Sequence, residues 1–392
     1  MFVIAKRMAL AQCDRSFRPH TANTDMMSDL AEMRKVLVLY TGGTIGMQKN
    51  HNGVYAPVPE VFASKVKTCQ ELHDYELARI YSIRDHELIT KALHCNKVIT
   101  YQIQEYQPLL ASSNMTAKEW ITIAETIEKN YHDFDGFVIL QGTDTMAYTS
   151  SVLSFMFKNL NKPIILTGSQ IPIFETPSDA KNNFLYSLVF ASCSDIPEVC
   201  VFFANRLLRG NRVKKVHNSQ IIAFETPNYH ILAETGLHVK MYRNFMLPKM
   251  ERGMLSVFTN LCTRVGILHI FPTLSRTQLL SFLEPTLEGV VLITYGVGNI
   301  PSDRQDLIDV LRNAVGRGVT VVNVTQCLRG SVAVLYETGH RMEEIGIIPC
   351  YDITVEAAYT KLMVICGMEK KSEERAELMK QVMRGEMTIQ PY

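Results

Sequence analysis

The sequence predicts an α/β protein made of two layered domains. A chain of 392 residues is too long for one compact core and short for three. Apolar runs of strand length alternate with helical patterns along it, which is typical of helices layered on a sheet. Its 47% hydrophobic and 20% charged residues are ordinary for a globular protein.

Residues 1–33 are expected to be a disordered extension. The first ten residues are fairly apolar, but Lys6 and Arg7 interrupt the run, and a secretory signal needs an unbroken apolar stretch. Basic residues outnumber acidic ones four to one as far as Arg18. A mitochondrial transit peptide therefore stays open as the alternative.

The predicted N-terminal domain covers residues 34–243, and its fold is expected to begin at Lys35. Short continuous apolar runs predict buried parallel strands. These runs are residues 36–40, 136–140, 163–167 and 198–204. Helices are predicted after the capping box Thr116–Glu119, after Thr145 as far as about Leu160, and after Ser178.

Residues 244–263 lose this rhythm, gain Pro248 and Gly253, and are interpreted as a linker. A C-terminal domain is predicted over residues 264–392. A βαβ crossover forms its clearest part. The predicted elements are a strand at 289–295, a helix at 303–315, a strand at 319–324 and a last helix at 373–383.

Charge and cysteine use narrow the choice of partners and compartment. A formal net charge of +1 supplies no long-range attraction to nucleic acid or anionic membranes, so neither is an expected partner. No apolar run has the length of a membrane-spanning helix. Nine scattered cysteines without a C-x-x-C pair suit a reducing compartment, which predicts a cytoplasmic protein. The eleven histidines are spread out, so a metal site is not expected.

Two polar segments follow predicted strands, which is where ligands bind in open α/β sheets. They are Thr41–Gly46, with its paired glycines, and Gly142–Thr145 at a strand-to-helix junction. Neither matches a phosphate-binding or dinucleotide-binding motif. Each segment alone is read more simply as a turn or a helix cap.

A threonine hydroxyl becomes a nucleophile only with a base or proton relay, and a lysine of lowered pKa is one such group. Lys214 and Lys215 follow the run Arg209–Arg212. Spacing alone does not say which lysine acts. On its own, the region reads as a solvated basic loop.

The two polar segments closely resemble the signatures of the L-asparaginases, nearest to the cytoplasmic type I branch. The resembling runs are Thr41-Gly42-Gly43-Thr44-Ile45-Gly46-Met47, Gln141-Gly142-Thr143-Asp144-Thr145-Met146-Ala147-Tyr148, Gly168–Pro172, Arg209–Arg212, Tyr295–Asn299 and Val324–Cys327. The resemblance covers about residues 35–388. It implies a larger N-terminal domain with a mixed sheet, a smaller C-terminal domain with a parallel sheet, and no cofactor.

The resemblance also implies roles for single residues. Thr44 is expected to attack the amide carbon of L-asparagine and form an acyl-enzyme. Tyr55 matches a flexible-loop tyrosine beside that hydroxyl. The implied catalytic residues are Thr44, Tyr55, Thr143, Asp144 and Lys215. The implied substrate-binding residues are Ser112, Ser113, Thr143, Asp144 and Asn299, the last reaching a neighbouring site in a homodimer or homotetramer.

Other functions stay open beside asparagine hydrolysis. A glutaminase-like amidase, or the amidase of a tRNA-dependent amidotransferase, would share the fold and nucleophile, and one methylene of substrate is worth only about 1–3 kcal/mol of discrimination. A non-catalytic amino-acid sensor would keep the pocket without turnover. The chain also departs from its relatives at Ala111, Lys214 and Ile293. An isoleucine cannot replace a guanidinium, so allosteric activation by asparagine is an open question.

Overall fold

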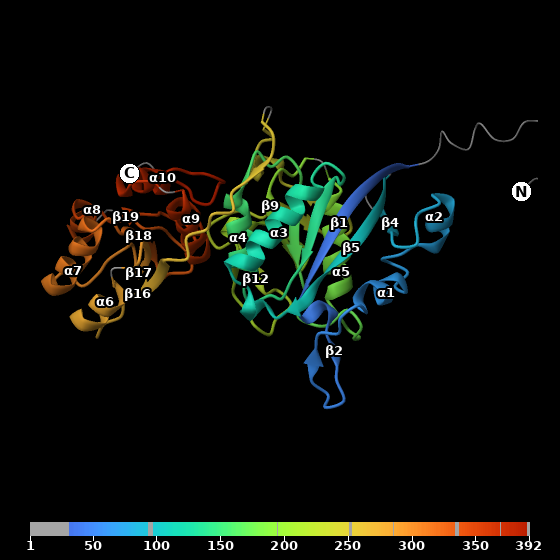
Figure 1. Cartoon of the computed structure of the whole chain (residues 1–392), viewed down its shortest axis with the longest axis horizontal. Helices are drawn as coiled ribbons and strands as arrows, with labels where there is room; N and C mark the ends of the chain where they lie inside the picture. Colours follow the sequence, from blue (N-terminus) through green and yellow to red (C-terminus); the bar gives the residue numbers. More distant parts are fainter. Residues whose placement is uncertain are drawn as a thin grey trace, which may run out of the picture.

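The computed structural model describes residues 31–92, 97–193, 195–250, 253–284, 286–333, 337–368 and 370–389. Two α/β domains lie side by side in it, with the linker passing between them (Figure 1). Residues 1–30 of the predicted extension 1–33 lie outside the described residues. The first strand, β1, begins at Glu32, three residues before the predicted start.

The N-terminal domain is built on a sheet of nine strands, which is mixed as predicted. From edge to edge its strands are β14 (Val239–Met241), β13 (Ala233–Thr235), β10 (Arg206–Arg209), β9 (Val199–Phe203), β8 (Ile164–Thr167), β6 (Gly136–Leu140), β1 (Glu32–Gly42), β5 (Lys97–Leu110) and β4 (Leu88–Ala92). The five strands from β9 to β5 are parallel, and the outer pairs are antiparallel. Two short hairpins lie outside the sheet: β2 (Gln48–Lys49) with β3 (Tyr55–Ala56), and β11 (Lys214–Lys215) with β12 (Phe224–Glu225).

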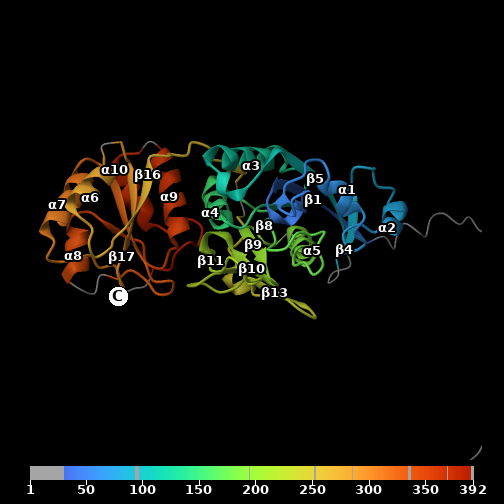
Figure 2. The ribbon, with the colours of Figure 1, turned by 90° about the horizontal axis from the view of Figure 1, so that it is seen from below.

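Helices cover both faces of this sheet (Figure 2). On one face lie α3 (Ala117–Asn130) and α4 (Met146–Met156), and on the other lie α5 (Ala180–Ala191) and α1 (Phe62–Lys67), with α2 (Tyr75–Ile80) beside β4. Side chains alternate along β1, so Leu37 and Leu39 join the first face's core and Val36 and Val38 join the other. The capping box predicted at Thr116 begins α3.

The C-terminal domain has a four-stranded parallel sheet, also as predicted. Its strands are β16 (Val265–His269), β17 (Gly289–Thr294), β18 (Thr320–Thr325) and β19 (Ile348–Pro349). Its helices are α6 (Arg276–Phe282), α7 (Gln305–Gly316), α8 (Glu337–Glu344), α9 (Val355–Gly367) and α10 (Ser372–Lys380). Within the described part of the chain, no helix is long and apolar enough to cross a membrane.

The structure corrects two local expectations. The helix expected as far as Leu160 ends at Met156, because the next residues form β7 (Phe157–Lys158) and pair with β15 (Ser256–Val257) in the linker. The run Arg209–Arg212, expected to be a solvated basic loop, is buried. Its arginines are held by carboxylates that spacing along the chain does not reveal.

Those arginines join the two domains. Arg212 forms an ion pair with Asp352 of the C-terminal domain at 2.9 Å, and its Nε donates to the carbonyl of Gly385 at 2.7 Å. The Asn211 amide donates to the carbonyl of Arg384. Helices α4 and α9 pack against each other, and one apolar core runs through both domains. The last described segment is therefore folded back onto the N-terminal domain.

That segment is held by a fully buried ion pair. The Nζ of Lys361 on α9 lies 2.7 Å from Glu386, and both side chains are 0% exposed. Lys361 also donates to the carbonyls of Met379 and Gln381. Burial alone would raise the pKa of Glu386, but Lys361 and backbone N–H groups hold it below its usual value.

We expect Glu386→Gln to lower the free energy of unfolding by about 3–5 kcal/mol, because it leaves the Lys361 cation buried without a counter-charge. Urea denaturation followed by fluorescence measures the loss. The matched control is Glu377→Gln, whose ion pair with Lys380 is exposed and should contribute less than about 1 kcal/mol. Equal losses in both variants would contradict the role of the buried pair.

Candidate active site

Three polar segments meet at one edge of the N-terminal sheet. Strands β5, β1 and β6 are parallel neighbours, so their carboxyl ends lie side by side. The 3-10 turn η1 (Thr44–Gly46) follows β1, the turn η2 (Ser112–Asn114) follows β5, and residues 141–145 follow β6. This edge is where open α/β sheets bind ligands.

Glycines bring the first and third segments into direct backbone contact. Gly43 has φ +88°, and a Cβ there would lie 2.2 Å from the backbone nitrogen of Gly142. A Cβ on Gly142 would in turn lie 2.7 Å from the Ser112 hydroxyl. Only residues without side chains allow the three segments to approach this closely. Thr44 is therefore held next to the segment that carries Thr143.

Lys215, Thr143 and Asp144 form one hydrogen-bonded cluster. The Lys215 ammonium donates to the Thr143 hydroxyl and to the Asp144 carboxylate, both at 2.7 Å. Ser112 bonds the other oxygen of Asp144 at 3.4 Å and accepts the Asp144 backbone N–H at 3.3 Å. The structure thus joins four of the predicted site residues, from three elements far apart in the sequence.

Burial differs sharply within this cluster. The Asp144 side chain is 69% exposed and that of Lys215 is 19% exposed, while Thr143 is buried. Asp144 faces solvent and is accessible to a ligand, while its oxygens also accept bonds from Lys215 and Ser112. The Thr143 hydroxyl accepts a bond from the lysine, which leaves its own O–H free to donate or to pass on a proton.

A network of side-chain hydrogen bonds supports the cluster, and the sequence did not predict it. The Thr145 hydroxyl donates to the carbonyl of Ser112 at 2.8 Å, which ties η2 to the 141–145 segment. The Gln141 amide donates to Thr145 and Thr149, and the Trp120 indole donates to Thr149 at 2.9 Å. Trp120 is the only tryptophan of the chain and was available as a signal, but nothing in its spacing pointed to Thr149.

The remaining predicted residues stand apart from this cluster. Tyr55 is 39% exposed, on the β2–β3 hairpin that projects from the domain (Figure 1). Among the described residues no hydrogen bond joins Tyr55 to Thr44, and the ammonium of Lys49 lies 5.3 Å from the tyrosine ring. Ser113 is exposed beside Ser112. Asn299 follows β17 in the C-terminal domain.

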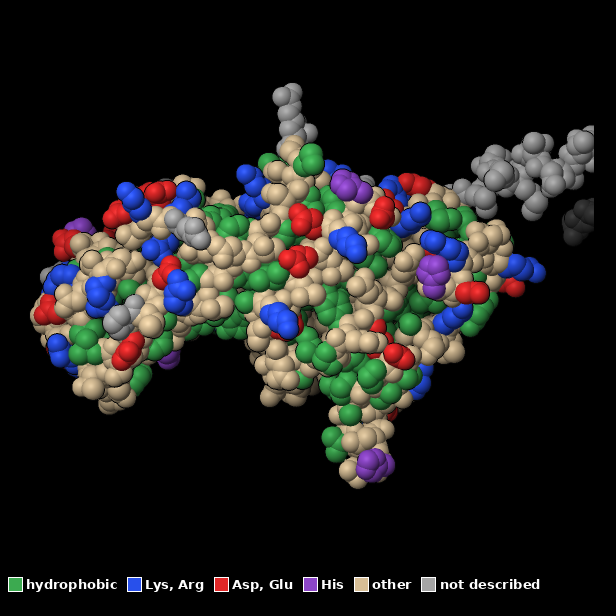
Figure 3. All heavy atoms as spheres, in the orientation of Figure 1, with side chains coloured by type: hydrophobic (Ala, Val, Ile, Leu, Met, Phe, Trp, Pro, Cys, Tyr) green, Lys and Arg blue, Asp and Glu red, His purple; other side chains and the backbone are tan. Residues whose placement is uncertain are grey.

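The surface carries no single dominant charge on the face drawn in Figure 3, where acidic and basic side chains are interspersed. The lower outline of that view is indented between the two domains. Among the residues the structure describes, no group of three or more His, Cys, Asp or Glu side chains is arranged to hold a metal ion.

A hollow of about 200 Å³ lies between the two domains. Lys214, Ile293 and Cys327 are among the residues lining it. The Lys214 ammonium is bound to Glu356 at 3.2 Å. Two of the three sequence departures therefore meet at one place, while Ala111 precedes η2.

Two protein-family models match the chain. The model described as "Asparaginase, N-terminal" matches residues 35–247, and "Glutaminase/Asparaginase C-terminal domain" matches residues 264–379. A solved structure, that of L-asparaginase I from Vibrio cholerae, superposes with a TM-score of 0.78 at 37% sequence identity. The match covers 91% of this chain and 100% of that one.

Individual proteins are similar over the same extent. An L-asparaginase of Dirofilaria immitis is 42% identical, over 91% of this chain and 61% of its own length. A Mus musculus protein named 60 kDa lysophospholipase is 41% identical, over 91% and 63%. L-asparaginase 1 of Escherichia coli strain K12 is 40% identical, over 91% and 99%. The chain thus spans about three-fifths of the first two relatives and nearly all of the third.

We expect Gly43→Ala to destabilise the protein by about 1–3 kcal/mol more than Gly53→Ala, because only the first adds a backbone clash. Both glycines have positive φ, but a Cβ at Gly53 meets nothing within 4 Å. The strain of an alanine at positive φ is therefore common to the two variants. Chemical denaturation measures the difference, and equal stabilities would contradict the close approach of the two segments.

Proposed function

We propose that this chain, which belongs to the L-asparaginase family, hydrolyses L-asparagine to L-aspartate and ammonia through a threonine acyl-enzyme. The observation that carries the proposal is the cluster of Lys215, Thr143 and Asp144 beside the Thr44 turn. A hydroxyl nucleophile needs a positioned proton relay. The cluster supplies such a relay, because Gly43 in the Thr44 loop touches Gly142 in the segment that carries Thr143 and Asp144.

Substrate binding follows from the charges of the amino acid. Asparagine carries an ammonium and a carboxylate on one carbon. We infer that exposed Asp144 holds the ammonium, and that the hydroxyls of Ser112 and Ser113 donate to the carboxylate. Fixing both groups directs the side-chain amide toward Thr44 and replaces a bimolecular encounter with a positioned one.

The reaction then divides into two steps. The Thr44 hydroxyl oxygen bonds to the amide carbon while its proton passes through Thr143 and Lys215 to the amide nitrogen, and the carbon–nitrogen bond breaks to release ammonia. Backbone N–H groups after the paired glycines stabilise the oxyanion, each contributing about 3–4 kcal/mol. Water next attacks the ester carbon, the Thr44–substrate bond breaks, and the threonine regains its proton as aspartate leaves.

Tyr55 is proposed to act only after the hairpin moves. The hairpin stands away from the sheet and its two strands are two residues long, so few contacts oppose its movement. A closed hairpin brings the Tyr55 hydroxyl toward Thr44 and excludes water while the acyl-enzyme forms.

A second chemistry deserves a parallel assay, because relatives named 60 kDa lysophospholipase are equally similar. The same threonine would cleave an ester by the same two steps. The groups around Thr143, however, are charged and hydroxylated, which suits an amino acid better than a fatty acyl chain. Glutamine differs from asparagine by one methylene and remains the closest competing substrate.

We also propose that active sites form between copies of the chain. Asn299 follows a strand of the C-terminal domain, at the carboxyl edge where ligands bind. A homodimer or homotetramer is expected, in which Asn299 of one copy completes the site of another. The free thiols of the described cysteines further support a reducing, cytoplasmic location.

We expect wild-type protein to release ammonia from asparagine, with kcat reduced about 10⁴-fold by Thr44→Ala and about 10²–10⁴-fold by Thr143→Ala and Lys215→Met, which remove the relay. Coupled ammonia detection measures turnover on asparagine and glutamine, and fatty-acid release measures turnover on lysophosphatidylcholine. Thr122→Ala, an exposed helix position, is the control. Full activity in Thr44→Ala would refute the role of Thr44 as nucleophile. If folded wild-type protein bound asparagine without turnover, the non-catalytic amino-acid sensor would be the reading that stands.

We expect Asp144→Asn to raise KM for asparagine about 10–100-fold, because a bond to a charged group worth about 1.5–3 kcal/mol is lost. Turnover of succinamate, which lacks the α-ammonium, should fall less than turnover of asparagine, because only the effect on the bond to Lys215 remains. Steady-state kinetics on both substrates separates this binding role from the proton relay. A matched loss on succinamate would contradict it.

We expect Thr44→Ala and Asn299→Ala subunits, each inactive alone, to recover about a quarter of wild-type activity when refolded together. Random pairing makes half the dimers mixed, and each mixed dimer holds one intact site of two. Sedimentation equilibrium establishes the oligomer. No recovery from a mixture that does form mixed dimers would show that Asn299 serves its own chain.

A further inference from the structure

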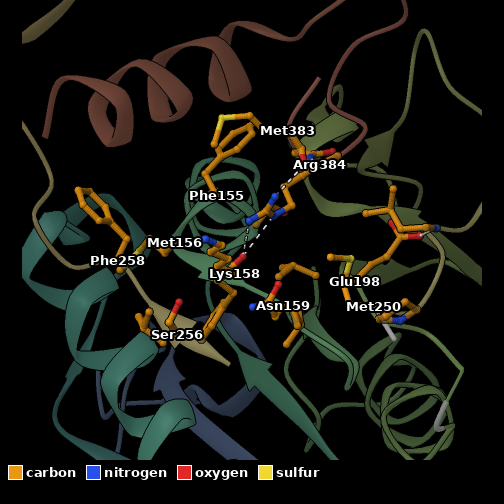
Figure 4. Close-up of a pocket in the computed structure, with 18 of the residues that line it drawn as sticks. Phe155, Met156, Lys158, Asn159, Glu198, Met250, Ser256, Phe258, Met383 and Arg384 are labelled. Carbon is orange, nitrogen blue, oxygen red and sulfur yellow. Dashed lines mark hydrogen bonds between the residues drawn. The ribbon is translucent and has the colours of Figure 1, made fainter. Parts of the chain in front are cut away.

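A cavity of about 790 Å³ lies where the two domains and the linker meet (Figure 4). Its walls are the end of α4 with β7, the start of β9, the linker, and the segment around α10 and Arg384. Helix α4 has 11 residues and is about 17 Å long. The segment 141–145 lies at its start and the cavity at its end, so this cavity is separate from the active site.

The cavity wall is mostly apolar and adaptable. Two phenylalanines and three methionines are among the residues that line it: Phe155, Phe258, Met156, Met250 and Met383 (Figure 4). Methionine side chains are unbranched and adjust to irregular apolar ligands. The volume falls within the range of small-molecule sites, about 300–1,000 Å³. A flexible hydrocarbon chain matches this lining.

The one buried carboxylate in the wall is already neutralised. Glu198, 1% exposed at its side chain, receives Arg209 Nε at 2.7 Å and a second guanidinium nitrogen at 3.2 Å. It also accepts the backbone N–H of Leu247. Glu198 is thus neutralised by Arg209 and almost fully buried, so it does not favour a cationic ligand in the cavity.

Arg384 has the opposite character. Its guanidinium donates to the carbonyl of Phe157 at 3.0 and 3.2 Å and to that of Met383 at 2.8 Å. A guanidinium has five N–H donors, so two remain. Among the described residues, no carboxylate lies within ion-pair distance of the Arg384 guanidinium. The nearby carboxylate of Glu386 is paired with Lys361 instead. Burial lowers the pKa of Arg384 and Glu386 opposes this, but an arginine stays charged.

Lys158 adds a second cation at the rim. It is exposed and labelled beside Arg384 in Figure 4, and no described carboxylate lies within ion-pair distance of it. The cavity therefore combines an apolar interior with uncompensated positive charge at one side. An anion that also carries an apolar chain satisfies both features.

We propose that this cavity binds the anion of a medium- or long-chain fatty acid. The carboxylate accepts the free N–H donors of Arg384, and the hydrocarbon chain lies against the methionine and phenylalanine side chains. Binding involves no covalent step and does not depend on the proposed hydrolysis. Because the linker and the segment after α10 both form walls, the ligand stabilises the joint between the domains.

The first test uses the full chain and three ten-carbon probes below their micellar concentrations: decanoate, decanol and decyltrimethylammonium. We expect decanoate to bind one to one by calorimetry and to raise the melting temperature by several degrees, since a ligand of the folded state stabilises it. Decyltrimethylammonium should do neither, and decanol should bind at least tenfold more weakly. Equal effects of decanoate and decanol, or no binding of decanoate, would overturn the proposal.

Two variants then locate the site. Arg384→Gln should weaken decanoate binding at least tenfold and leave decanol unchanged, while Arg312→Gln, on an exposed part of α7, should alter neither. If Arg384→Gln does not fold, Ser256→Trp serves instead, because Ser256 is exposed at the cavity wall and an indole there obstructs it. Undiminished decanoate binding in the folded variant would place the ligand elsewhere and overturn the proposal.

Discussion

The parallel register of β5, β1 and β6 determines where Thr44, Ser112 and the segment 141–145 fall. Val36 to Tyr40 pair with residues 136–140 on one side and with residues 101–105 on the other. Three strands that run side by side must deliver their following loops to the same edge. Glycines at 42, 43 and 142 then let those loops touch through their backbones. Slipping one strand by a residue would turn its apolar side chains to the wrong face and separate the loops.

Much of the central architecture could be predicted from the sequence. The family, the mixed and parallel sheets, the capping box at Thr116 and the strand over residues 136–140 are confirmed. Strands buried on both faces and capped helices depend on local residues, so local patterns reveal them. The roles of all the predicted site residues stay predictions, because a resemblance implies them and no contact among the described residues tests what they do.

What the sequence concealed depends on contacts between distant segments. The run Arg209–Arg212 looks like a solvated loop until Glu198 and Asp352 are brought beside it. Helix α4 ends early because the linker supplies a strand partner a hundred residues away. The network of Gln141, Thr149 and Trp120 joins two helices to a strand end. Whether a charged or amide side chain is buried or solvated can be predicted only when its hydrogen-bond partner is known.

The folding back of the last described segment carries a consequence for synthesis. Three side chains of the run Arg209–Arg212 donate to that segment. Arg209 and Arg212 donate to the carbonyl of Gly385, Asn211 donates to the carbonyl of Arg384, and Arg212 also donates to the Thr388 hydroxyl. Lys215 of the site cluster lies only three residues beyond Arg212. A ribosome emits the chain from its amino end, so the loop bearing Lys215 lacks these anchors until residues 384–388 have been made and have left the exit tunnel. A nascent chain therefore makes the loop of Thr44 early and secures the position of Lys215 late.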